Sequence, residues 1–168
     1  PTKLETETQL LRLLSNSPLQ LDIDFLQVKS HKAKNVSRIH MAKFYNTFDD
    51  IKDNKYDGMI ITGAPVEHLE FEEVDYWDEL CIGVFPHKSL DITHPLMRGL
   101  DDVYYVPHSR HTETRLQDIA LVKQLQVISY SEISGVHIIS DMDCRQFFVT
   151  GHSEYDRDTL AKEYFRDK

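Results

Sequence analysis

The fold is indicated most clearly by the stretch Met59-Ile60-Ile61-Thr62-Gly63-Ala64-Pro65. Three consecutive apolar residues are typical of a short buried strand, and the turn-forming residues after them indicate a loop at its carboxyl end. Before the strand, residues 37–48 carry apolar side chains near helical spacing, and a turn is indicated at 57–58. This order is the repeating unit of an open α/β sheet, whose functional loops follow the strands.

The rest of the chain continues this alternation. A helix is expected from Thr2 to Pro18, and alternating apolar residues over 19–25 predict a strand. Residues 67–79 carry acidic side chains without any Lys or Arg, which favours a solvated helical face for all of them except Glu67, because Glu67 sits in the loop after the strand. Further strands are predicted at 82–85, 103–106, 125–128, 136–139 and 146–149, the last two as a hairpin or as two adjacent strands, with a final helix from 158. We therefore expect one α/β domain over residues 1–168.

The composition is that of a globular protein with 168 residues, 40% hydrophobic and 28% charged. A net charge of −9 is opposite in sign to the basic surface that nucleic-acid binding requires. The sequence shows neither an apolar run of membrane-spanning length nor a secretory signal, so a membrane is not an expected partner either. Two cysteines, Cys81 and Cys144, form no disulfide framework and no CxxC motif, which favours a reducing cytoplasm.

The most informative local pattern is a glycine, a histidine and a carboxylate directly after the predicted strand at 146–149. His152 and Glu154 have the spacing of a base and the acid that orients it, which together form half of a nucleophilic triad. A plain surface loop is the alternative. The nucleophile has no candidate, because neither cysteine lies in a tight strand-to-helix elbow and Ser109 is not in a GxSxG motif.

The chain has nine histidines, which raises the question of a metal site. No pair has the i, i+4 spacing of a helical HExxH motif. His108 and His111 follow a predicted strand and could line a pocket, which is an alternative to metal ligation. We expect no metal ion.

Several long motifs resemble the homoserine O-acyltransferases of methionine biosynthesis, the transsuccinylase/transacetylase family with a class I glutamine amidotransferase-like fold. The motifs follow the family's order over nearly the whole chain. They are PTKLETE (1–7), LLRLLSNSPLQ (10–20), DG (57–58), ITGAPVE (61–67), EEVDYW (72–77), PHSRHTE (107–113) and VTGHSEYD (149–156). The resemblance implies a three-layer, flavodoxin-like arrangement, in which helices cover both faces of an open, mostly parallel sheet.

The resemblance also implies a ping-pong reaction, in which an acyl group passes from acyl-CoA to a cysteine thiol and then to the hydroxyl of L-homoserine. Acetyl-CoA is then a co-substrate, and no bound cofactor is expected. By position, His152 resembles the catalytic base, Glu154 its partner, Ser109 a residue of acceptor recognition and Arg166 the residue that binds the acceptor carboxylate. Glu67 resembles the position that selects acetyl-CoA, because a glutamate there would repel the carboxylate of a succinyl group. The family further implies a homodimer.

The chain departs from the family between Leu80 and Gly83, which only Cys81 and Ile82 separate. There the family carries further helix, a strand and a Cys-Trp-Gly-Ala-like elbow with the nucleophile. Either the written chain omits residues of an active enzyme, or it is a deletion that cannot catalyse. We favour the first, because loss of a central strand would leave backbone groups unpaired. The open alternatives are a succinyl donor, an L-serine acceptor, a glutamine amidotransferase-like hydrolase and a non-catalytic binding module.

Overall fold

The computed structural model describes residues 3–29, 36–63 and 76–167. The chain divides into two compact units, residues 1–64 and 65–168. A single domain over the whole chain therefore stays a prediction. Within the described ranges, no helix is long and apolar enough to cross a membrane.

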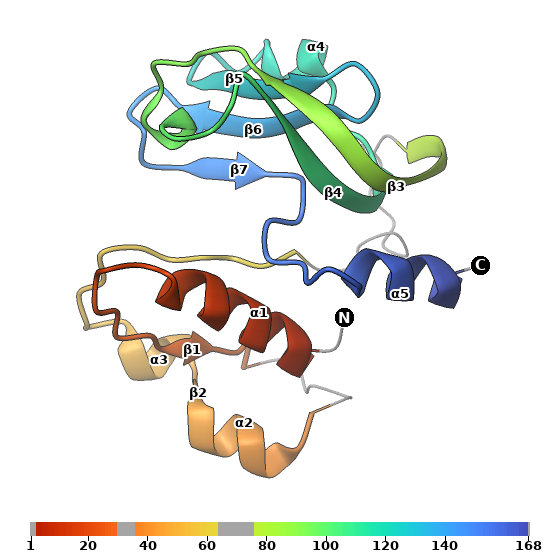
Figure 1. Cartoon of the computed structure of the whole chain (residues 1–168). Coiled ribbons are helices and arrows are strands. Elements are labelled where there is room, and N and C mark those ends of the chain that lie inside the picture. The colour runs from red at the N-terminus through yellow and green to blue at the C-terminus, as the bar shows by residue number, and fades with distance from the viewer. Residues whose placement is uncertain (1–2, 30–35, 64–75, 168) are drawn as a thin grey trace. The chain divides into compact units, whose positions relative to one another are not determined.

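The first unit combines three helices with a small parallel sheet (Figure 1). Its only sheet among the described residues pairs two short parallel strands, β1 and β2. Ser37 caps α2 by accepting a hydrogen bond from the N–H of Ile39, and Thr47 and Asp50 form a capping box at α3. The helix predicted before Pro18 is confirmed. The helix predicted over 37–48 is confirmed only as far as Phe44, because residues 45–46 form β2. The bounds are α1 Lys3–Ser15, β1 Phe25–Leu26, α2 Arg38–Phe44, β2 Tyr45–Asn46 and α3 Phe48–Ile51.

The strand predicted at residues 59–61 is not formed, and residues 59–63 have no regular secondary structure. The side chains of Met59, Ile60 and Ile61 are 71%, 60% and 81% exposed. The physical reason is a lack of partners: an apolar strand becomes buried only between neighbouring strands, and the two strands of this unit are two residues long each.

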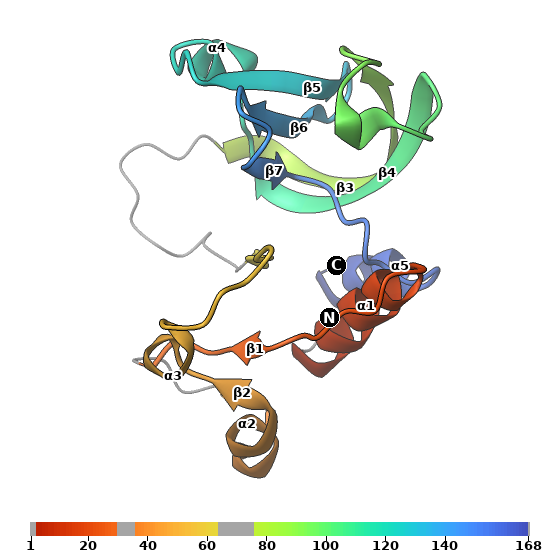
Figure 2. The ribbon, with the colours of Figure 1, turned by 90° about the vertical axis from the view of Figure 1, so that its left-hand side faces the viewer.

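The second unit is a curled five-stranded sheet in the order β4-β3-β5-β6-β7, followed by a helix that packs against β3 and β4 (Figures 1 and 2). Every strand pair in this sheet is antiparallel. The bounds are β3 Tyr76–Ser89, η1 Pro95–Met97, β4 Val103–Thr112, α4 Leu116–Ile119, β5 Leu125–Ser131, β6 Gly135–Asp141, β7 Phe147–Val149 and α5 Thr159–Asp167. The mixed α/β class is confirmed, as are the predicted hairpin and the final helix.

The larger described sheet is antiparallel, not mostly parallel as expected. The reason is the short connections: residues 132–134 join β5 to β6 and residues 142–146 join β6 to β7, and turns of this length connect only antiparallel neighbours. Two further expectations need correction. Residues 76–79, expected in a helix, belong to β3, and the rest of that acidic segment from 67 lies outside the described residues. The segment His108–His111, expected in a loop after a strand, lies within β4.

The core of this unit lies around β6, whose residues from Gly135 to Ser140 are all buried. In one cluster, Ile138 packs with Ile128 and Met97. In a second cluster, Ile139 and Val136 pack with Ile119 of α4. Because consecutive side chains of a strand point to opposite faces and all of these residues are buried, both faces of β6 are covered. This strand therefore lies at the centre of the core of the second unit.

Three imidazoles, those of His87, His108 and His137, are also buried in this sheet. The Nδ1–H of His87 donates to the carbonyl of Phe85, so the Nε2 of His87 is left to accept from the Nε2–H of His108, 3.2 Å away. The Nε of Arg110 lies 3.4 Å from the Nδ1 of His108. This pattern of donors and acceptors requires both imidazoles to be neutral. Burial, together with the charge of Arg110, lowers the pKa of His108 to about 3, and burial lowers the pKa of His137 to about 3.

We expect the free energy of unfolding to fall as the pH is lowered from 6.5 to 5. In an unfolded chain these histidines take up protons near pH 6.5, whereas His108 and His137 in the folded chain do not until about pH 3. The unfolded state therefore binds more protons in this window, and each group contributes a slope of up to about 1.4 kcal/mol per pH unit. Urea titrations at several pH values measure this slope. A free energy of unfolding that is constant between pH 6.5 and 5 would contradict it, and the exposed-site variant His111→Asn should retain the slope of the parent.

Candidate active site

His152 and Glu154 form a hydrogen-bonded pair just beyond β7. The Nδ1 of His152 lies 2.9 Å from the Oε1 of Glu154, and the side chains are 32% and 18% exposed. Because a carboxylate only accepts hydrogen bonds, the proton of the neutral imidazole lies on Nδ1. Within the described part of the chain, Nε2 has no hydrogen-bond partner. This is the arrangement in which a histidine can act as a general base through Nε2.

The backbone before His152 is fixed by the sheet. Thr150 makes two hydrogen bonds to β6. Its side-chain hydroxyl donates to the carbonyl of Val136 at 2.7 Å, and its backbone N–H donates to the carbonyl of His137 at 3.0 Å. The N–H of His152 then donates to the carbonyl of Pro107 on β4 at 2.9 Å. The residues that follow β7 are thereby held between β6 and β4, and the imidazole is delivered from a rigid scaffold.

Gly151 makes this close passage of the chain possible. A Cβ at this position would lie 2.3 Å from the Cγ1 of Val106 and 3.1 Å from ring atoms of His137. Real Cβ atoms do not approach neighbours as closely as 2.3 Å, so a side chain at this position requires the side chains of Val106 and His137 to shift. The glycine in the motif is thus explained by packing rather than by an unusual backbone angle.

We expect Gly151→Ala to lower the free energy of unfolding by about 1–3 kcal/mol, the usual cost of overpacking a tight site. Gly58→Ala is the matched control, because a Cβ there meets no atom within 4 Å. That control should change stability by no more than about 1 kcal/mol, in the stabilising direction. Urea denaturation of the two variants measures the difference. Equal stability of both would show that Gly151 is not closely packed.

The carboxyl of Glu154 is tuned towards the ionised form. Burial opposes its ionisation, but the hydrogen bond and charge interaction with His152 outweigh burial, so the pKa of Glu154 lies below its usual value. A carboxylate that stays ionised can hold the imidazole in one tautomer and stabilise the imidazolium that forms when Nε2 takes up a proton.

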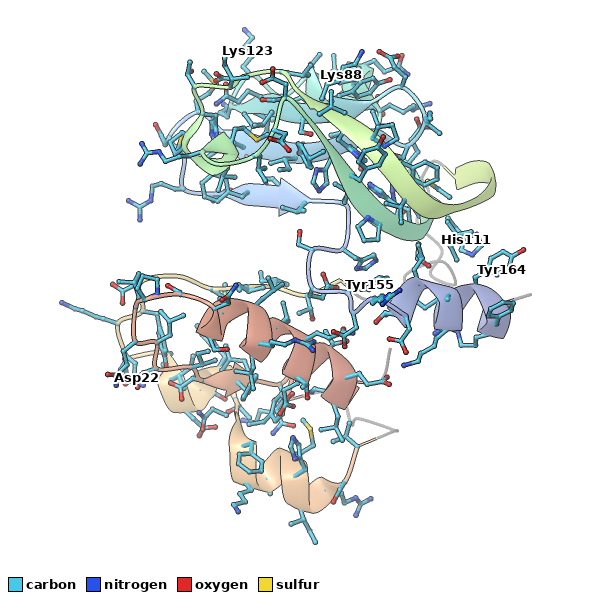
Figure 3. All side chains as sticks on the ribbon, in the orientation of Figure 1. Asp22, Lys88, His111, Lys123, Tyr155 and Tyr164 are labelled. Carbon is cyan, nitrogen blue, oxygen red and sulfur yellow. The ribbon has the colours of Figure 1, made fainter. Side chains whose placement is uncertain are left out.

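Tyr155 and Glu163 complete the surroundings of this imidazole. The ring of Tyr155 stacks on that of His152, with centroids 4.1 Å apart and planes 12° apart. The hydroxyl of Tyr155 donates to the Oε2 of Glu163 at 2.6 Å, and Ser109 also hydrogen-bonds Glu163. Figure 3 shows Tyr155 at the start of the segment that leads into α5. Sequence reasoning missed both residues. The aromatic residue next to Glu154, with an acid on the following helix, was the available signal.

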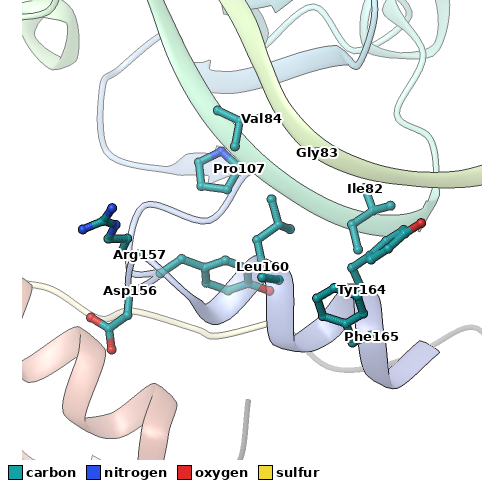
Figure 4. Close-up of a pocket in the computed structure, with 11 residues that line it drawn as sticks. Ile82, Gly83, Val84, Pro107, Asp156, Arg157, Leu160, Tyr164 and Phe165 are labelled. Carbon is teal, nitrogen blue, oxygen red and sulfur yellow. The ribbon is translucent and has the colours of Figure 1, made fainter. Parts of the chain in front are cut away.

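An apolar groove of about 570 Å³ adjoins this site, between α5 and the strands β3 and β4 (Figure 4). Leu160, Tyr164 and Phe165 line it from the helix, and Ile82 and Pro107 line it from the sheet. Tyr155 also lines this groove, so the site and the groove share a wall.

The other predicted site residues fall into two groups. Ser109 lies on β4 and contacts Glu163, which precedes Arg166 on α5, so the structure brings Ser109 to the helix that carries Arg166. Arg166 itself is exposed. Glu67, the expected donor-selecting residue, lies outside the described residues.

Neither cysteine has the surroundings of a triad nucleophile. Cys81 is half-buried, and burial raises the pKa of its thiol, although the charge of Arg110 opposes this. Cys144 is exposed in the turn between β6 and β7, where its Sγ lies 3.4 Å from the Nε2 of His94. The imidazole partner of Cys144 is therefore His94 and not His152.

The structure separates the two histidines considered as pocket-lining residues. His108 is buried and His111 exposed, as expected for residues three positions apart on a strand. Within the described ranges, no group of three or more His, Cys, Asp or Glu side chains is placed to hold a metal ion.

The chain matches the family model described as homoserine O-succinyltransferase (HTS) over residues 1–82 and 80–168. It is 46% identical to a homoserine O-acetyltransferase from Methanomethylophilus alvi, over 99% of this chain and 67% of that protein. It is 45% identical to one from Acetivibrio thermocellus, over 99% of this chain and 68% of that protein. Both alignments run over 206 residues, although this chain has only 168. The relatives therefore carry residues that have no counterpart here.

A weaker likeness exists to a solved structure from Thermoplasma acidophilum, which is described as part of a GMP synthase. It has a TM-score of 0.43 and 15% identity, and it covers 56% of this chain and 45% of that one. At this level the likeness does not define the fold.

Proposed function

The chain belongs to the homoserine O-succinyltransferase family of acyltransferases, and from this premise we propose that it carries the base and the acceptor site of a homoserine O-acetyltransferase. The observation that carries the proposal is the His152–Glu154 pair, joined at 2.9 Å with the Nε2 of His152 left to accept a proton. The names of the relatives favour acetyl as the transferred group.

In the proposed reaction, Nε2 of His152 acts twice as a base. It first takes the proton of a cysteine thiol while the sulfur attacks the thioester carbonyl of acetyl-CoA. The coenzyme A thiolate leaves with that proton, and an acetyl thioester remains on the protein. Nε2 then takes the proton of the homoserine hydroxyl while its oxygen attacks the acetyl carbonyl, and the thiol is released with the proton. Glu154 stabilises the imidazolium in both steps.

The thiol for this reaction has to come from residues that the relatives carry and this chain does not. Three observations support a position near residue 81 for these additional residues. The family match is split at residues 80–82. The pairing of β3 with β4 loses its register between Tyr76 and Cys81. Among the described residues, β3 pairs with β5 only at Lys88 and Ser89, so most of that edge of β3 is available to a further strand.

The proposed additional residues also bear on the fold. With the additional residues in place, the sheet would gain strands beside β3 and take the three-layer, mostly parallel arrangement of the class I glutamine amidotransferases. An unpaired strand edge inside a domain leaves backbone groups without hydrogen bonds, which is the physical reason to expect such an addition. A homodimer in the reducing cytoplasm remains the predicted state of that protein.

The acceptor site is proposed around α5. Arg166 would bind the carboxylate of homoserine, because a guanidinium can hold a carboxylate through two parallel hydrogen bonds. Ser109, anchored on Glu163 of the same helix, would define the neighbouring wall. L-serine is the nearest competitor. It is one methylene shorter, a difference worth about 1–3 kcal/mol in an apolar pocket.

A second candidate function follows from the cysteines. Because neither of them pairs with His152, the 168-residue chain on its own fits a binding module that retains affinity for the amino acid through Arg166. Calorimetry with homoserine distinguishes this function: binding by the chain without release of coenzyme A thiol would support it. A glutamine amidotransferase-like hydrolase would instead hydrolyse a glutamine amide and form no thioester from acyl-CoA.

Catalysis can be tested in a restored chain, defined here as this sequence with the residues that the Methanomethylophilus alvi relative carries between the positions of Leu80 and Gly83. We expect the restored chain to have a higher kcat/KM with acetyl-CoA than with succinyl-CoA, and Glu67→Gly to reduce that ratio, because the substitution removes the charge that repels succinate. Release of coenzyme A thiol with each donor measures this. A preference for succinyl-CoA in the unsubstituted restored chain would contradict the assignment.

A further inference from the structure

The imidazole of His152 is held at an edge and on a face by two different residues. Glu154 binds the edge that carries Nδ1. Tyr155 covers one face, at a centroid distance of 4.1 Å and an angle of 12°. A single hydrogen bond at Nδ1 leaves the plane of the ring free to tilt about that contact, whereas a nearly parallel aromatic plane also fixes the tilt of the ring.

Tyr155 is in turn held by a buried carboxylate. Glu163 is only 6% exposed, and it accepts a hydrogen bond from the hydroxyl of Tyr155 at 2.6 Å and another from Ser109. Burial opposes the ionisation of Glu163, but hydrogen bonds such as these outweigh burial and its pKa lies below the usual value. Burial and the bond to Glu163 raise the pKa of the Tyr155 phenol well above its usual value. The phenol therefore stays protonated and keeps donating to Glu163.

From this geometry we infer that Tyr155, anchored by Glu163, is a positioning residue for the base His152. The inference rests on the proposed function, since it assigns a supporting residue to the same reaction. The aryl face fixes the plane in which Nε2 points away from Glu154. It also stabilises the imidazolium that forms in each half-reaction, because a cation is attracted to the face of an aromatic ring.

The contacts from His152 through Tyr155 to Glu163 also connect the base to α5. His152 follows β7, Ser109 lies on β4 and Glu163 lies on α5, so the Tyr155–Glu163 bond links the base to the helix that carries Arg166. Binding of an acceptor carboxylate at Arg166 would act on the same helix that sets the orientation of the base.

The first test is spectroscopic and uses the 168-residue chain itself. A long-range ¹H–¹⁵N NMR spectrum of the histidine rings reports which nitrogen is protonated, and His152 is assigned by its loss in His152→Asn. We expect Nδ1 protonated and Nε2 unprotonated in the parent. In Tyr155→Leu, which removes the aromatic face, the two nitrogen shifts should move towards each other as the tautomers mix. Tyr164→Leu is the matched control, because Tyr164 lines the same groove from α5.

Two more conservative variants test the inference if Tyr155→Leu fails to fold. Tyr155→Phe retains the ring but loses the hydroxyl, and Glu163→Gln retains the shape of the side chain but loses the charge. Both disrupt the same anchor, so each should displace the His152 signals in the same direction, and the double variant should displace them no further. The inference is overturned if Tyr155→Phe and Glu163→Gln leave the His152 signals where they are in the parent. It is equally overturned if Tyr164→Leu moves those signals as much as Tyr155→Leu does.

The restored chain gives the kinetic counterpart. We expect Tyr155→Leu to lower kcat by up to about 10²-fold, the cost of displacing a catalytic group by roughly 1 Å, with a much smaller change in the KM for homoserine. Tyr155→Phe should recover most of the loss. The two proposals fail separately. If the restored chain transfers no acyl group, the proposed function fails while the NMR result stands. If the nitrogen shifts of His152 are the same in the Tyr155 variants as in the parent, the positioning role fails, whatever activity the restored chain has.

Discussion

Replacing His152 by Asn in the restored chain is expected to lower kcat/KM for acyl transfer by about 10²–10⁴-fold, the usual contribution of a general base. Asparagine keeps a side chain that can hydrogen-bond Glu154 but has no group that takes up a proton at neutral pH. Both half-reactions lose their proton acceptor, so the rate of acetyl-enzyme formation and the rate of transfer to homoserine should fall together. Stopped-flow measurement of coenzyme A release, with and without homoserine, separates the two steps.

Two further variants serve as comparisons for His152→Asn: one changes the partner of the base, and the other is a surface control. Glu154→Gln should cause a smaller but still large loss, because the imidazole remains while its preferred tautomer and the charge opposite the imidazolium are lost. His111→Asn, which removes an exposed histidine from β4, should leave the rate within about twofold of the parent, as expected for a surface change distant from any special feature. Retention of a tenth or more of the activity in His152→Asn would exclude His152 as the base.

The second large effect concerns the thiol. The 168-residue chain is expected to form no acetyl-enzyme with acetyl-CoA, whereas the restored chain does. Moreover, the double substitution Cys81→Ser and Cys144→Ser should leave the activity of the restored chain within about threefold. Burial disfavours the thiolate of Cys81, and Cys144 is paired with His94 instead of His152, so neither is an activated nucleophile.

The matched control replaces by serine the cysteine that the family resemblance implies in the inserted segment. This substitution should abolish turnover in a chain that retains Cys81 and Cys144. Thiol alkylation gives an independent measurement, since protection of the essential cysteine by acetyl-CoA should slow inactivation. If the Cys81→Ser and Cys144→Ser substitutions abolished activity, the nucleophile would lie within this chain and the account of the additional residues would be wrong.

How far the sequence predicted this molecule differs between its two units. Local signals predicted two helices of the first unit: Pro18 follows the end of the first helix, and Ser37 caps α2 as an N-cap residue should. The helix expected over the acidic segment was wrong at residues 76–79, which lie in β3. The strands over 125–149 were also predicted, because alternating or continuous apolar residues between turn signals define a hairpin locally. What failed was the sheet direction, the strand at 59–61 and most of the strand at 19–25, of which only Phe25 lies in a strand, β1 Phe25–Leu26. These features depend on partners far away in sequence.

The site shows the same division. The His152–Glu154 pair is readable in one motif, since two residues on one short segment determine its geometry. Tyr155 and Glu163 were missed, because their contact joins a loop to the following helix and is visible only when both are folded. The nucleophile cannot be predicted from this chain at all. The family match is split at residues 80–82, close to the register break of β3, and there we propose that the relatives carry more residues.

The central claim is that His152 activates a thiol that this chain does not contain. The most direct measurement is the intact mass of the restored chain after incubation with acetyl-CoA in the absence of acceptor. The account predicts a gain of one acetyl group that hydroxylamine or homoserine removes, and no such gain in His152→Asn or in the 168-residue chain. An acetyl group that forms equally fast without His152, or that forms on Cys81 or Cys144, would contradict it.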